Sequence, residues 1–159
     1  MNLKTQASQA LQSWSPYRGT VQTLNVSHDG QHLTCELTSL DTVGCSLARV
    51  ALQDDALAGA DLSRLQQVSQ ELVRRVNYLL EPIGPIEHDA EGCTVLMRSL
   101  PPQKENGVTS YYELLVRTSG ELTLARYESA AGQLRAAVPF NLTREVLLRL
   151  VGDLSEAAR

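Results

Sequence analysis

The 159-residue chain has few aromatic residues and no excess of positive charge. One Trp, five Tyr and one Phe are too few for a surface that stacks nucleic-acid bases. A formal charge of -4 and a pI near 5.3 give no sign of the concentrated basic face that phosphate binding requires. We therefore expect no nucleic-acid partner.

Long apolar runs and targeting signals are also missing. No run approaches the roughly 20 residues that span a bilayer. The first residues, MNLKTQASQALQSW, lack both the apolar centre of a secretory signal and the arginines of a transit peptide. A content of 43% hydrophobic and 20% charged residues is typical of a globular domain with a sizeable core. We predict a single cytoplasmic domain over residues 1–159 with no membrane partner.

The residues of common catalytic sites do not occur in recognisable patterns. The sequence has no G-x-x-x-x-G-K-[ST], G-x-G-x-x-G, G-x-S-x-G or H-E-x-x-H. His28 and His32 flank a turn without the further ligands that a metal needs. The cysteines are Cys35, Cys45 and Cys93. Their spacing does not suit a metal, and we interpret them as free thiols. We predict no catalytic residue, metal or cofactor, and a non-enzymatic protein is the preferred interpretation.

Hydrophobic periodicity predicts three helices separated by runs of strands. The helices are expected at about 3–14, 62–80 and from 142 onward, the last two capped by Asp61 and Asn141. The strands are expected at about 20–28, 31–37, 45–52, 83–88, 94–100, 109–117 and 121–128. The segments PPQKENG and AAGQLRAAVPF are expected to be loops. The order α-β-β-β-α-β-β-β-β-α, with short turns between strands, predicts an α+β fold in which helices pack on an antiparallel sheet.

Two stretches 77 residues apart share a frame of identical letters. They read ELTSLDTVGCSLAR over 36–49 and ELLVRTSGELTLAR over 113–126. The next helices begin with the similar segments DLSR and NLTR. An internal ββα duplication and coincidence both remain open as interpretations.

Hairpin geometry predicts how the charged ends of these stretches pair. A two-residue turn at Ser119-Gly120 would place Glu113 opposite Arg126, and the turn of the first hairpin would place Glu36 opposite Arg49. A cross-strand ion pair contributes about 0.2–1 kcal/mol and helps to fix register. We interpret the repeated frame as scaffold, because a Glu–Arg pair without a third group is not a catalytic apparatus.

This register places apolar residues on the face of the sheet that should be solvated. In the second hairpin the face would carry Tyr111, Glu113, Leu115, Leu122, Leu124 and Arg126. In the first hairpin it would carry Leu40, Cys45 and Leu47. Either the fold itself covers these residues, or they form a surface for self-association or for a partner. The second interpretation is the main functional hypothesis, with Leu124→Glu expected to convert an oligomer into a monomer.

By its order of elements the chain resembles the small acidic type III secretion chaperones, whose helix-and-sheet domains form dimers and hold effector segments. The resemblance covers most of the chain, rests on no residue motif, and leaves one additional β-hairpin here. It implies a homodimer with apolar grooves and names no site residues. We therefore expect a protein-binding, self-associating domain with a chaperone-like or adaptor-like role. The alternative is a small-molecule-binding protein or an enzyme with a pocket between helix and sheet.

Overall fold

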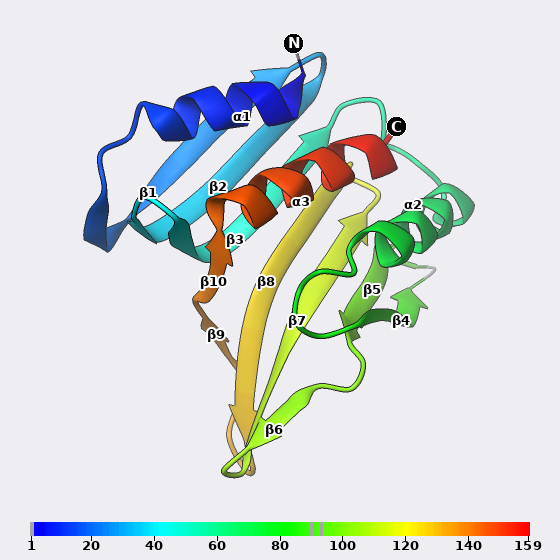
Figure 1. Ribbon diagram of the computed structural model, residues 1–159. Coiled ribbons are helices and arrows are strands. Elements are labelled where there is room, and N and C mark those ends of the chain that lie inside the picture. Colours follow the sequence, from blue (N-terminus) through cyan, green and yellow to red (C-terminus); the bar gives the residue numbers. More distant parts are fainter. Residues whose placement is uncertain (1, 90, 93) are drawn as a thin grey trace.

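The computed structural model describes residues 2–89, 91–92 and 94–159, which form one antiparallel sheet with three helices on one of its faces (Figure 1). The predicted α+β class and the predicted order of elements are both confirmed. The core lies between the helices and the sheet and consists largely of leucine side chains. No helix in the described part of the chain is long and apolar enough to cross a membrane.

The helices are α1 (Leu3–Gln12), α2 (Leu62–Arg75) and α3 (Arg144–Ala157). Each begins with a side-chain oxygen that accepts from a backbone N–H of the first turn, provided by Asn2, Asp61 and Thr143. The predicted Asp61 cap is confirmed. The predicted Asn141 cap is wrong, because Asn141 lies in a short strand that precedes α3.

Helix α2 is shorter than predicted. It ends at Arg75, and residues 76–82 form a linker that is neither helix nor strand. The Asn77 side chain donates to the Arg74 carbonyl at 3.4 Å, an alternative to the backbone bond of another helical turn. Val76 and Leu79 are nevertheless buried as predicted, which shows that the linker packs against the core.

The sheet has the order β1-β2-β3-β8-β7-β5-β4, with short strands β6, β9 and β10 paired to β7, β8 and β3. The strands are β1 (Tyr17–His28), β2 (Gln31–Leu40), β3 (Gly44–Asp54), β4 (Ile83–Asp89), β5 (Thr94–Ser99), β6 (Gln103–Glu105), β7 (Val108–Arg117), β8 (Glu121–Ala130), β9 (Ala136–Val138) and β10 (Phe140–Thr143). The three short strands lie in segments predicted as loops or as the start of the last helix. Helix α1 packs on β1 and α3, α2 packs on β4, β5 and β7, and α3 packs on β3 and β10.

The β2–β3 hairpin has the predicted pairing but not the predicted faces throughout. Glu36 lies opposite Arg49, as expected. The predicted ion pair between them is wrong, because the Arg49 guanidinium pairs instead with Glu121 of β8 at 3.1 Å. Register irregularities on both sides of Leu37 then change the alternation of the side chains. The residues that this change turns toward the helices are Leu40, Cys45 and Leu47, all buried. Their expected position on the solvated face is therefore wrong.

The β7–β8 hairpin is offset by one residue from the predicted register. Its loop has three residues, 118–120, and the N–H of Gly120 donates to the Arg117 carbonyl at 2.9 Å. Gly120 has a φ of +91°, and a Cβ there would lie 2.5 Å from the carbonyl oxygen of Asp54. Glu113 therefore lies opposite Ala125, and the predicted Glu113–Arg126 pair is wrong. A shift of one residue moves every predicted partner to the other face.

Candidate functional site: a protein-binding surface

The structure divides the six predicted interface residues between the two faces of the sheet. Tyr111, Glu113 and Leu115 lie on the outer face, while Leu122, Leu124 and Arg126 lie on the helix side. Leu122 and Leu124 are 0% exposed and belong to the core, so the fold itself covers them. A glutamate at position 124 would disrupt the core, and Leu124→Glu therefore cannot test self-association.

On the outer face, a compact polar cluster surrounds Glu113. This carboxylate is 5% exposed and forms an ion pair with Arg135, and Arg98 Nε lies 3.7 Å away. The Arg135 guanidinium lies 3.9 Å from the ring centroid of Tyr127, and that of Arg98 lies 5.0 Å from the ring of Tyr111. The two arginines thus cover both the carboxylate and the aromatic rings.

The contacts of Arg135 favour its charged form. A hydrogen bond with Tyr111 and the ion pair with Glu113 raise the pKa of Arg135 above its already high ordinary value. Because Arg135 pairs with Glu113 and both arginines lie over tyrosine rings, we interpret the outer cluster as a cover of the sheet rather than as an open binding site.

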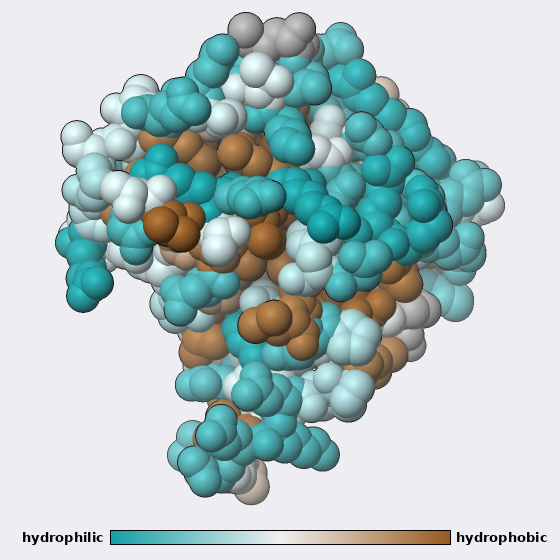
Figure 2. Space-filling model, viewed as in Figure 1, coloured by the Kyte–Doolittle hydropathy of each residue, from teal (hydrophilic) through white to brown (hydrophobic). Residues whose placement is uncertain are grey.

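On the helix side, a group of apolar residues lies beside the linker that follows α2. We call it the Leu80 surface, and it consists of Leu80, Pro82, Pro101, Pro102 and the buried Tyr112 beside them. Leu80 is fully exposed, with a relative accessibility of 103%. Cavities of about 440 and 490 Å³ adjoin it, and both are lined by Leu80, Glu81 and Pro82. Figure 2 shows hydrophobic surface gathered in the lower middle of this view, below α2 and α3.

A buried ion pair lies next to the Leu80 surface. Arg126 Nη1 and Nη2 donate to the two carboxylate oxygens of Glu81 at 3.3 and 2.8 Å, and both side chains are only 13% exposed. The Arg126 guanidinium also lies 4.6 Å from the ring centroid of Tyr112. Arg126, predicted as an interface residue, thus connects strand β8 to the linker that carries Leu80.

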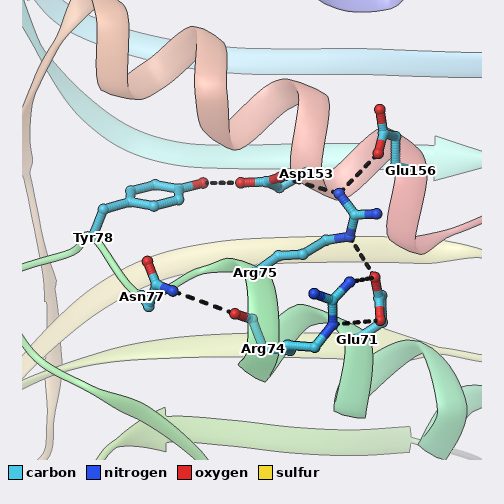
Figure 3. A network of polar contacts seen from close by, with 7 residues as sticks. All are labelled: Glu71, Arg74, Arg75, Asn77, Tyr78, Asp153 and Glu156. Carbon is cyan, nitrogen blue, oxygen red and sulfur yellow. Dashed lines mark hydrogen bonds and ion pairs between the residues drawn. The ribbon is translucent and has the colours of Figure 1, made fainter.

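A second polar network connects the same linker to α3 (Figure 3). The Tyr78 hydroxyl donates to Asp153 Oδ2 at 2.8 Å. Arg75 lies 3.4 Å from Asp153 and 2.8 Å from Glu156, and its Nε donates to Glu71 at 2.6 Å. Burial, followed by the hydrogen bond to Asp153, raises the pKa of Tyr78, so the hydroxyl remains a donor at neutral pH.

The two described cysteines lie in positions where a thiol is unreactive. Cys35 and Cys45 are buried, and burial raises their pKa values to about 12 and about 11. His28 shares a hydrogen bond with Gln6, and His32 lies 3.2 Å from Asp55. Over residues 2–89, 91–92 and 94–159, no three His, Cys, Asp or Glu side chains come together as metal ligands. Cys93 lies outside the described residues.

A polar cavity of about 350 Å³ lies where the two chain ends meet the β1–β2 turn. Lys4, His28, Gln31 and Arg159 contribute to its lining. The Gln31 amide donates to Asp54 at 2.8 Å and to the Ser155 carbonyl at 2.9 Å, so its donors are satisfied within the protein. The lining comes from helices α1 and α3 and from the ends of strands β1 and β2, so this cavity lies between helices and sheet, where the small-molecule alternative places a pocket.

Comparison with known proteins gave no match to a family model, a curated protein or a solved structure. The Leu80 surface was not predicted from the sequence. Its one sequence signal is the pair Leu79-Leu80 directly before Glu81-Pro82, because Leu79 belongs to the predicted core stripe and Leu80 lies outside that stripe.

Proposed function

We propose that this protein is a non-enzymatic protein-binding domain that self-associates through the Leu80 surface. The observation that carries the proposal is a fully exposed leucine beside two cavities, within a continuous apolar group. Single exposed leucines are common on monomeric proteins, whereas contiguous apolar surface with a polar surround is typical of interaction sites. The nearby arginine and tyrosine are residue types enriched at the centres of interfaces.

A second copy of the chain suits this surface because the surface is complementary to itself. It carries both a projecting side chain, Leu80, and cavities beside it. A two-fold arrangement would place each Leu80 in a cavity of the other copy. The charged residues that line the two cavities are Glu81 and Arg126, which neutralise each other. Two chains of net charge -4 can therefore meet here without opposing like charges.

The proposed homodimer agrees with the dimer that the resemblance to type III secretion chaperones implies. A chaperone-like or adaptor-like role belongs to the same proposal, because paired apolar grooves could hold a segment of another protein.

Two leucines of similar exposure provide the test. Leu80→Asp should give a monomer, because it would place a carboxylate in an apolar interface. Leu134, 96% exposed in the loop before β9, provides the matched control Leu134→Asp, which should keep the wild-type mass. Neither substitution alters the core. Size-exclusion chromatography with light scattering reads the masses, and identical masses for both variants would overturn the proposal.

A further inference from the structure

We infer that Tyr78 is a positioning residue for the Leu80 surface, because its hydrogen bond to Asp153 holds the linker in the conformation that presents Leu80. The inference rests on the proposed function. It assigns to the contact between linker and α3 a role in binding in addition to its role in stability.

Four residues of the linker anchor it to the rest of the protein, and Leu80 is the residue that it exposes. Val76 and Leu79 are buried at 1% and 2% exposure, Tyr78 contacts α3, and Glu81 contacts Arg126 of β8. In the sequence, Leu80 lies between the buried Leu79 and the ion-paired Glu81. Its own side chain is fully exposed. The N–H of Val76 donates to the Leu72 carbonyl and the Pro82 carbonyl accepts from the N–H of Leu100, so backbone hydrogen bonds fix the two ends of the linker. Between these ends, the path of the chain depends on such side-chain anchors.

Asp153 is held in place by contacts other than the one with Tyr78. Arg75 Nη1 lies 3.4 Å from its carboxylate, and Arg75 is itself fixed by Glu71 and Glu156 (Figure 3). These contacts orient the Asp153 carboxylate independently of its hydrogen bond with Tyr78. The guanidinium of Arg149 lies 4.2 Å from the Tyr78 ring centroid, so both the ring and the hydroxyl of Tyr78 contact α3.

Anchoring of this kind affects affinity because ordering a loop during association opposes binding. A side chain or loop that is already fixed loses less conformational freedom when the complex forms. Removal of the Tyr78 hydroxyl should leave Leu80 attached to a looser linker. The surface would keep its composition and lose part of its pre-organisation.

Tyr78→Phe tests this directly, because it removes the hydroxyl and keeps the ring. Asp153 keeps its contact with Arg75, so no buried charge loses its only partner. We expect the dimer Kd to rise roughly threefold to tenfold, the range expected for one immobilised side chain. The matched control is Tyr17→Phe, which removes a hydroxyl that donates to the Leu37 carbonyl at 2.6 Å on β2. Its Kd should equal that of the wild type.

A double-mutant cycle separates positioning from general stability. In a Leu80→Ala background, Tyr78→Phe should cause little further change in Kd, since no leucine remains to be positioned. An equal effect of Tyr78→Phe with and without Leu80 would overturn the inference, as would an unchanged Kd in the single variant. These outcomes leave the proposed function intact. The proposed function fails on a separate result, namely a Leu80→Asp variant with the mass of the wild type.

Discussion

The two sides of the β7–β8 hairpin carry the same three residue types in different arrangements. The sets are Glu113, Arg135 and Tyr127 on the outer face, and Glu81, Arg126 and Tyr112 on the helix side. On the outer face Arg135 is 40% exposed and covers the carboxylate and the ring beside it. On the helix side the ion pair is buried, and an apolar leucine beside it faces solvent.

This difference shows that an ion pair can either cover the apolar groups beside it or leave one of them exposed to solvent. An arginine at the surface covers apolar groups with its stem and keeps its charge in water. On the helix side Arg126 also lies over a ring, that of Tyr112, but its pair with Glu81 holds the linker so that the neighbouring Leu80 side chain stays uncovered. The outer face is therefore complete within one chain, whereas the Leu80 surface is where the same hairpin can accept a partner.

The largest expected effect concerns the leucines on the two faces of the hairpin. Leu124→Ala should lower the free energy of unfolding by about 2–5 kcal/mol, because it leaves a cavity in the core. Leu115→Ala, on the outer face and partly exposed, should cost about 1 kcal/mol or less. Urea denaturation measures both values. Equal losses would show that the two faces are not packed differently.

The next largest effect is the difference in unfolding free energy between alanine variants of the two arginines. Arg126→Ala should cost about 3 kcal/mol, since it leaves Glu81 buried without its partner. Arg135→Ala should cost about 1 kcal/mol, because Arg135 is partly solvated and Arg98 stays near Glu113. The same denaturation experiment compares them. A larger loss for Arg135→Ala would contradict the assignment of the desolvated pair to the helix side.

The fold could be predicted because its signals are local. Helical and alternating periodicities located the long elements, and Asp61 marked the start of α2. The pairing of Glu36 with Arg49 followed from a turn in which the Asp41 carboxylate accepts from the N–H groups of Val43 and Gly44. In the second hairpin, Ser119-Gly120 suits both a two-residue and a three-residue loop. The difference of one residue in loop length decides which side chains face the core.

The candidate site could not be predicted because its contacts join distant parts of the chain. Tyr78 and Asp153 are 75 residues apart, and Arg126 and Glu81 are 45 residues apart. Local pattern extends α2 to Leu80, and only these tertiary contacts show that the chain leaves the helix at Val76. The likeness of the two repeated stretches was equally uninformative, because Glu113 and Arg126 do not occupy the positions of Glu36 and Arg49.

The smallest expected effect concerns an ion pair on the solvated side of α2. Hydrogen bonds from Arg74 and Arg75 lower the pKa of Glu71 from its ordinary 4.5 to about 2. Its contribution to stability is therefore complete above pH 4.5 and is lost as the pH falls from 4.5 toward 2. Glu71→Gln should remove this dependence, so wild type and variant should converge in acid. A stability difference that stays constant between pH 6 and pH 3 would contradict this account.

The most direct test of the central claim is the mass of the wild-type protein over a wide range of concentrations, measured by sedimentation equilibrium. We expect a reversible rise from the chain mass of 17.4 kDa to about twice that value. A mass of 17.4 kDa at every concentration would contradict self-association through the Leu80 surface.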